Sequence, residues 1–173
     1  KLKGLRPPRE PWPEAKIKSF REKAAPLPLL IFEMLLGTGQ RIGDVLKMRW
    51  DDIEDGGIWV RQQKTGAGIF VPFTDGLAVV LDQTRRAGET IIAQPNGRTC
   101  SYSLAHKLVT EVRVEIDAMA WDIHALRHSA ASEIASLPGM SIEQVMAITG
   151  HSSEQMARHY SRKADMRAKA REA

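Results

Sequence analysis

Apolar residues recur at helical spacing over most of this chain, between short polar breaks. The stretches with this pattern are, in chain order, EAKIKSFREKAA from Glu14, LPLLIFEMLLGTG, RIGDVLKMRW, DGLAVVLDQTRRAG, SYSLAHKLVTEVRVEI, HALRHSAASEIAS, SIEQVMAIT and SEQMARHY. We expect Gly37 and Gly39 to close the second helix, and Pro138 and Gly139 to separate the sixth from the seventh, because these residue types end helices. Arg41 is expected at the N-terminal end of the third, short helix. The pattern predicts a mainly helical protein.

A different pattern begins at Gly57. The stretches GIWVRQ and GIFVPF are rich in β-branched and aromatic residues, and they flank QKTGAG, whose two glycines suit a turn. They predict a β-hairpin with Lys64 at or beside its tip. The short apolar stretch TIIAQ, before the turn PNG, is a candidate third strand. The expected fold class is therefore α+β, mainly α, with one small antiparallel sheet.

Length and composition are those of a globular domain. The chain has 173 residues, of which 43% are hydrophobic and 27% charged, and no run approaches the roughly 20 apolar residues that a membrane span needs. The single cysteine, Cys100, cannot form an internal disulfide, and no signal peptide stands at the start, so we expect a cytoplasmic protein. The net charge of +4 permits a nucleic-acid partner without requiring one.

The two ends of the chain are basic. Residues 1–13, KLKGLRPPREPWP, are also proline-rich, and the chain begins with Lys1 rather than Met. We expect residues 1–13 to be the remnant of an interdomain linker, residues 14–163 to form one domain of a longer protein, and residues 164–173 to be a C-terminal tail or helix. Solvated basic faces explain the charge as well as contact with DNA does.

The segment HALRH places three polar side chains on one helix face: His124, Arg127 and His128. Leu126, Ala130 and Ile134 repeat every fourth residue on another face, which can pack into the core. A lone histidine is usually structural. Two histidines that flank an arginine favour a function, because a buried arginine needs a paired anion.

A metal site is the first alternative for these histidines. His124 and His128 have the spacing of zinc ligands, and His151 could supply a third. Arg127 would then place a fixed positive charge beside the cation, the glutamate of the HExxH pattern is absent, and Cys100 has no partner cysteine. The metal interpretation is therefore the weaker one.

A phosphodiester fits this set of residues better. Guanidinium groups such as those of Arg41 and Arg127 bind nonbridging oxygens bidentately and stabilise the charge of a pentavalent transition state. Tyr160 is either a core ring or a nucleophile, and a phenol with a pKa near 10 attacks only if a base or nearby cations assist it. His124 could be that base, and Lys64 could be the acid for the leaving oxygen. No metal or nucleotide is required.

Four segments, TGQRIGDVLKMRWDDI, QQKTGAGIFVPF, HALRHSAAS and ITGHSSEQMARHYSRKA, occur in the order and with about the spacing of one known family. From about Glu14 to Lys163 the chain resembles the catalytic domain of the tyrosine recombinases, the phage integrase family. The resemblance implies a helical catalytic core of the DNA breaking-rejoining type and a site-specific recombinase or integrase. It would cut and rejoin DNA through a 3'-phosphotyrosyl intermediate, without cofactor, metal or ATP.

The resemblance also implies a role for each site residue. Arg41 and Arg127 would clamp the scissile phosphate, and Lys64 would be the general acid toward the 5' oxygen. His124 would transfer protons, His151 would support the phosphate, and Tyr160 would be the nucleophile. Arg61 is the alternative to Lys64, if the register of the hairpin differs by a few residues.

Three further residues match the family less directly. Asp44 stands three residues after Arg41, where an acid commonly orients that arginine, and a surface pair is the alternative. Trp50 is expected to pack rather than to contact DNA, and His128 to be structural.

The expected partners are double-stranded DNA and, in the full-length protein, three further copies in a homotetramer on paired DNA sites, with no membrane. Members of the family normally carry an N-terminal DNA-binding domain as well. The alternatives are a type IB topoisomerase with a similar residue set and a DNA-binding fragment that has lost activity.

Overall fold

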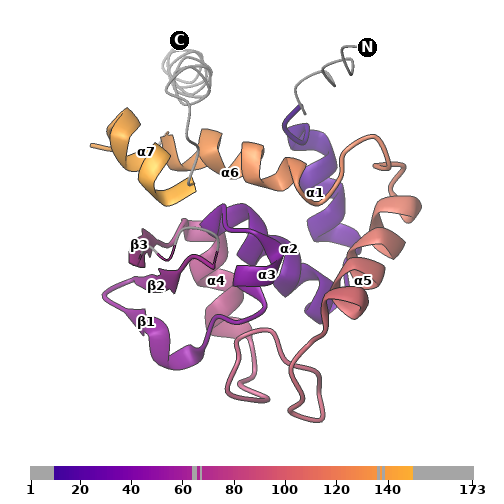
Figure 1. The fold of residues 1–173 in the computed structure, drawn as a ribbon. Coiled ribbons are helices and arrows are strands. Elements are labelled where there is room, and N and C mark those ends of the chain that lie inside the picture. The colour runs from indigo at the N-terminus through magenta and orange to yellow at the C-terminus, as the bar shows by residue number, and fades with distance from the viewer. Residues whose placement is uncertain (1–9, 64–65, 67, 136, 138, 150–173) are drawn as a thin grey trace, which may run out of the picture.

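The computed structural model of the protein describes residues 10–63, 66, 68–135, 137 and 139–149. The elements, in chain order, are α1 (Glu14–Lys23), α2 (Pro26–Thr38), α3 (Ile42–Val45), the 3₁₀ turn η1 (Trp50–Asp52), β1 (Ile53–Glu54), β2 (Gly57–Arg61), β3 (Gly68–Pro72), α4 (Asp75–Gln83), α5 (Tyr102–Glu115), α6 (Ala125–Ala135) and α7 (Ile142–Thr149). The predicted fold class, mainly helical with a small antiparallel sheet, is confirmed (Figure 1).

Helix α2 is the centre of the domain. Its sequence is apolar on all sides because α4, α5 and α6 each pack against it (Figure 1). Gly39 ends the helix in the left-handed region at φ 63°, as predicted. Gly37 lies inside the helix instead of closing it. Leu77 of α4 approaches this glycine so closely that a Cβ atom on it would stand 2.8 Å from the Leu77 side chain. That glycine permits close packing rather than a turn.

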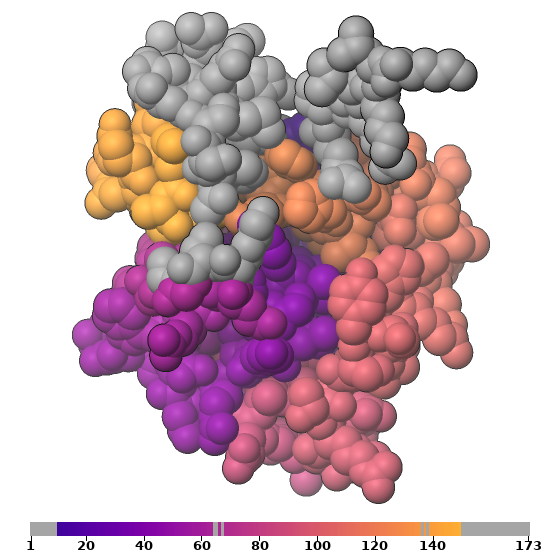
Figure 2. All heavy atoms as spheres, viewed as in Figure 1, coloured from indigo at the N-terminus to yellow at the C-terminus, as the bar shows by residue number. Residues whose placement is uncertain are grey.

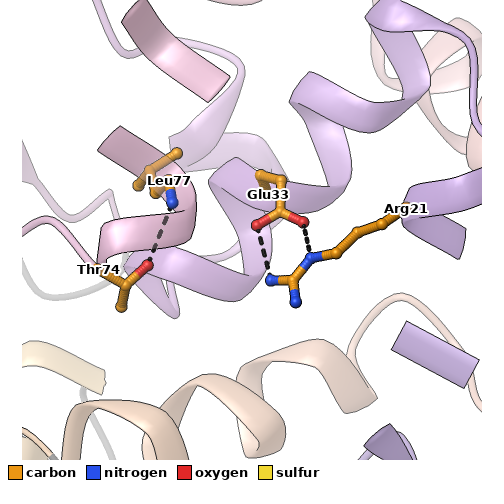
Figure 3. Close-up of polar contacts among 4 residues, drawn as sticks. All are labelled: Arg21, Glu33, Thr74 and Leu77. Atoms are coloured by element: carbon orange, nitrogen blue, oxygen red, sulfur yellow. Dashed lines mark hydrogen bonds and ion pairs between the residues drawn. The ribbon is translucent and has the colours of Figure 1, made fainter. Parts of the chain in front are cut away.

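A buried ion pair joins α1 to α2. The carboxylate of Glu33 is almost fully buried and accepts two hydrogen bonds from the Arg21 guanidinium, at 2.7 Å from Nε and 3.1 Å from Nη2 (Figure 3). These hydrogen bonds raise the pKa of Arg21. In the same region the Thr74 side chain accepts a hydrogen bond from the Leu77 backbone and caps the N-terminus of α4 (Figure 3).

The sheet has the strand order β1-β2-β3, and all its pairs are antiparallel. The predicted hairpin is confirmed, with Ile58 opposite Val71 on the buried face and Trp59 opposite Phe70 on the outer one. The predicted third strand at TIIAQ is wrong. Ile91 and Ile92 are buried in the core, and this stretch forms only isolated bridges, such as the one between Arg49 and Thr90. The third strand is β1, whose two residues are too short to show a pattern in the sequence.

Helices α6 and α7 lie together along one side of the domain, above α2, α3 and the sheet in the view of Figure 1. Leu126, Ala130 and Ile134 of α6 are fully buried, which confirms the predicted core face.

Trp12, at the end of the proline-rich segment, packs against this layer. Its backbone N–H donates to Ser129 Oγ at 2.8 Å, and its indole Nε1 donates to the Asp122 carbonyl at 3.0 Å. Its ring also makes edge contacts with Phe20 and Phe32. The last residues before α1 are therefore part of the core.

Candidate active site

The end of α2 fixes the backbone of Arg41. After Gly39 turns the chain, Arg41 takes the N-cap position of α3, where its carbonyl accepts hydrogen bonds from the backbone N–H groups of Asp44 at 2.8 Å and Val45 at 2.9 Å. The side chain is half-buried. Among the described residues, its buried Nη1 atom has no hydrogen-bond partner. A buried N–H donor without a partner is costly, so this atom is available to an acceptor.

Arg127 lies in the first turns of α6 with only 4% of its surface exposed. Its Nη1 atom donates to the carbonyl of Gly39 at 2.9 Å, which ties α6 to the turn that carries Arg41. Burial and, after it, the neighbouring charge of Arg41 lower the pKa of Arg127 to about 10, while Asp44 opposes the shift. The pKa is still above neutral, so the guanidinium stays charged.

The two residues Arg41 and Arg127, the arginine pair, are therefore two cations in one partly desolvated place. The chain brings them together across the contact of α6 with the end of α2. In Figure 2 the surfaces of these two regions adjoin on the face toward the viewer. Two buried guanidinium groups repel one another unless an anion lies between them. Their planar donor groups fit the oxygens of a phosphate or carboxylate.

His124 stands just before α6, three residues before Arg127 in the chain, and it is exposed. The carboxylate of Asp122 accepts a hydrogen bond from the Ala125 N–H at 2.8 Å and starts this turn. The ring of His128 packs edge-on against that of His124 at 5.9 Å between centroids, and His128 is buried. His124 can therefore contact a ligand from solvent, whereas the buried His128 ring packs against the ring of His124.

Asp44 is buried, so the alternative of a surface pair with Arg41 is wrong. Its Oδ1 atom accepts a hydrogen bond from the backbone N–H of Gln63 at 3.1 Å, and the Gln63 side chain donates to the Gly43 carbonyl at 3.0 Å. Asp44 thus fixes the strand end that immediately precedes Lys64, and it supplies a negative charge near Arg127. Periodicity could not show this contact, because the two residues are far apart in the sequence.

Three of the six predicted site residues, Lys64, His151 and Tyr160, lie outside the described residues, as does the tail 164–173. The structure brings Arg41 and Arg127 together, and the His124 carbonyl accepts a hydrogen bond from the Arg127 backbone N–H at 3.2 Å. Trp50 is buried as expected, and the Arg86 guanidinium lies 4.9 Å from its ring centroid. Two further buried residues beside the site, Gln40 and Gln62, were not predicted from the sequence.

In the described part of the chain, no group of three or more His, Cys, Asp or Glu side chains could hold a metal ion. None of the helices in this part is long and apolar enough to cross a membrane.

Comparison with known proteins adds independent information. The chain is 33% identical over 153 residues to the integrase of Escherichia phage HK022, which covers 79% of this chain and 42% of that protein. It is 34% identical over 156 residues to the tyrosine recombinase XerC of Mycobacterium leprae (strain TN), covering 80% and 52%. The chain thus spans about half the length of these relatives.

The fold has solved counterparts. A lambda integrase dimer bound to a COC' core site superposes with a TM-score of 0.74 at 28% identity, over 91% of this chain and 60% of that one. A lambda integrase tetramer bound to a Holliday junction gives 0.72 at 26% identity, over 90% and 49%. The model of the phage integrase family matches residues 14–167, a range that includes all six predicted site residues. The chain belongs to the phage integrase family.

Proposed function

We propose that this chain is the catalytic domain of a site-specific DNA recombinase that breaks and rejoins strands through a 3'-phosphotyrosyl intermediate, without metal or ATP. The observation that carries the proposal is the arginine pair: two partly desolvated cations, one with an unpartnered buried donor, beside an exposed histidine. This arrangement suits an anion with several acceptor oxygens. A DNA phosphodiester is such an anion, and the integrases and recombinases among the relatives act on DNA by name.

The arginine pair would bind the two nonbridging oxygens of the scissile phosphate. Attack on phosphorus places extra negative charge on those oxygens in the transition state. Because the Gly39 carbonyl already holds Arg127 and the α3 turn already holds the Arg41 backbone, little reorganisation is needed when that charge develops. Removal of one such donor typically lowers a rate by about 10²- to 10³-fold.

The covalent step needs a nucleophile, a base and an acid. Tyr160 Oη forms the bond to phosphorus as the bond from phosphorus to the 5' oxygen breaks. The phenol proton passes to His124, and the 5' oxygen takes a proton from Lys64, so that protons balance. One phosphodiester is exchanged for another. Attack by a 5' hydroxyl on the phosphotyrosine therefore rejoins the strand without ATP.

The proposed partners are double-stranded DNA and three further copies of the protein on paired sites. The support is the two lambda integrase structures, a dimer on a core site and a tetramer on a Holliday junction. We also propose that residues 1–13 link this domain to a preceding DNA-binding domain. Phosphate contacts from both domains would then supply affinity that falls steeply with salt.

The test is covalent trapping on a nicked suicide duplex. The recombination site is first mapped from the junction between the element and its host DNA, and the full-length protein is then incubated with that duplex in EDTA. Wild-type protein should form a covalent complex that survives denaturation, and Tyr160→Phe should form none. Absence of a wild-type complex, equal trapping by Tyr160→Phe, or loss of trapping in EDTA would contradict the proposal.

Two controls separate the alternatives. Relaxation of supercoiled plasmid without site preference would favour a type IB topoisomerase. Tight, salt-sensitive binding of the duplex with no covalent product would favour a DNA-binding protein without activity.

A further inference from the structure

Two buried glutamines meet at one backbone carbonyl beside the arginine pair. The Gln40 side-chain Nε2 donates to the carbonyl of Ile148 at 2.6 Å and to that of Thr38 at 3.0 Å. The Gln62 Nε2 donates to Gln40 Oε1 at 2.9 Å and to the same Ile148 carbonyl at 3.4 Å. Ile148 is the next-to-last residue of α7, where carbonyls need partners from outside the helix. The glutamine pair, Gln40 and Gln62, supplies these partners.

Each of the three participants stands close in the sequence to a predicted site residue. Gln40 immediately precedes Arg41, Gln62 is two residues before Lys64, and Ile148 is three residues before His151. The carbonyl therefore joins the turn after α2, the end of strand β2 and the end of α7. Four of the six predicted site residues, Arg41, Lys64, His151 and Tyr160, lie in these three segments or follow them along the chain. The other two, His124 and Arg127, stand at the start of α6, which packs against α7.

Hydrophobic packing alone does not require amides here. Both glutamines are about 2% exposed, and buried amides cost free energy unless their hydrogen bonds are made. Here the hydrogen bonds from both amides go to the backbone carbonyl of Ile148. They therefore depend on the position of the end of α7 and not on the side chain at residue 148. Satisfied polar networks of this kind favour one arrangement over other packings of similar energy.

We propose that Gln40 and Gln62 are positioning residues that set the end of α7 relative to the arginine pair and the end of strand β2. The glutamine pair would thereby fix the end of α7, from which the chain continues to His151 and Tyr160. This inference rests on the proposed function, because it gives the position of the end of α7 a role in cleavage. The amides are buried and uncharged, so they add nothing to DNA binding itself.

The test separates the cleavage rate from DNA affinity. Gln40→Met and Gln62→Met keep the side-chain length and remove the amide. On the nicked suicide duplex at saturating protein, each should form the covalent complex more slowly than wild type, on the order of 10- to 100-fold, as expected from small misplacements of reacting groups. The Kd for the same duplex should stay within about twofold, since no phosphate contact is lost. The double variant should be about as slow as the slower single variant, because both amides act on one carbonyl.

A matched control is Gln94→Met. The Gln94 amide also donates to a backbone carbonyl, that of Thr99 at 3.3 Å, but it lies in the exposed turn at residues 94–99. This variant should cleave at the wild-type rate. Glutamine-pair variants that cleave as fast as wild type would overturn the inference, and so would a loss of DNA affinity that accounts for the slower cleavage.

A second measurement needs no DNA. In hydrogen exchange on the wild-type chain, the amides of the last turn of α7, residues 145–149, should be protected about as well as those of α6. In Gln40→Met and Gln62→Met the same amides should exchange faster, while those of α6 stay protected. Unprotected exchange in the wild type, or unchanged exchange in both variants, would overturn the inference. If wild-type protein forms no covalent complex, the proposed function fails, and this comparison still decides whether the glutamine pair holds the end of α7.

Discussion

Arg21 and Arg127 are both arginines with buried partners, but the domain treats them in opposite ways. Arg21 forms two hydrogen bonds to the carboxylate of Glu33, and its pKa is raised (Figure 3). Arg127 donates to a neutral carbonyl, has the cation Arg41 as a neighbour, and has its pKa lowered to about 10. The first arginine is neutralised inside the fold. Within the described part of the chain, no carboxylate is hydrogen-bonded to the second.

The difference distinguishes a structural ion pair from an anion-binding site. A fold that needed only stability would pair a buried cation with an acid or replace it by an apolar residue. The arginine pair instead carries repulsion and desolvation that a bound phosphate would relieve. Asp44 reduces that repulsion near Arg127, but its carboxylate accepts a hydrogen bond from the Gln63 backbone N–H. Such a local cost in stability is common where a site is built to bind a ligand.

The largest expected effect comes from Arg127→Met. Cleavage of the suicide duplex should fall about 10²- to 10³-fold, because a preorganised donor to the transition state is lost. The free energy of unfolding should change by less than about 1 kcal/mol, since the lost hydrogen bond to Gly39 is offset by relief of the buried charge. Single-turnover trapping and urea denaturation measure the two quantities.

Arg127→Lys sharpens the same experiment. It keeps a positive charge but cannot form the planar, two-pronged contact with phosphate oxygens. Its cleavage rate should lie between those of wild type and Arg127→Met. A methionine variant that cleaves like wild type, or that loses several kcal/mol of stability, would place Arg127 in the same class as Arg21.

The next effect is on stability, from Arg21→Met. This change leaves the carboxylate of Glu33 buried without its cation, and we expect a loss of about 2 kcal/mol in unfolding free energy. The loss should be smaller than for a fully buried pair, because the Arg21 side chain is 43% exposed and water can reach the pair. Cleavage by the folded protein should be unchanged. Urea denaturation of Arg21→Met measures this effect. The control is the double variant Arg21→Met, Glu33→Gln, which should recover part of the lost stability because the buried charge is also removed.

The sequence predicted the helices well because their apolar periodicity is strong and local. It predicted α2 and the core face of α6, but it missed β1, which has two residues, and it placed a strand at Ile91 and Ile92, whose apolar run packs in the core without a neighbouring strand. The position of Gly37 inside α2 depends on Leu77 of another helix, which no local pattern contains.

The same difference between local patterns and contacts of distant segments holds for the site residues. Arg127 and His124 stand in one recognisable turn, so their association could be predicted from spacing. The approach of Arg41 to Arg127, the contact of Asp44 with the Gln63 backbone, and the meeting of Gln40 with Gln62 all join segments distant in the sequence. The family resemblance supplied the first of these contacts. The others follow only from the packing of α3, β2 and α7.

The smallest effect is a pH dependence that differs between the two arginines. The pKa of Arg127 is about 10 in the folded state, well below its ordinary value, so between these limits the unfolded chain binds the extra proton and stability rises with pH. Relative to Arg127→Met, the wild-type protein should gain about 0.4 kcal/mol in unfolding free energy by pH 10, and more above it. Arg21 has a raised pKa, so its contribution is fully present below its ordinary value, and the difference between wild type and Arg21→Met should be flat from pH 8 to pH 10.5. Urea denaturation of the three proteins across that range measures both slopes. A flat difference for Arg127 would mean that its charge is balanced in the folded protein as that of Arg21 is, and the contrast between a structural pair and an anion site would be lost.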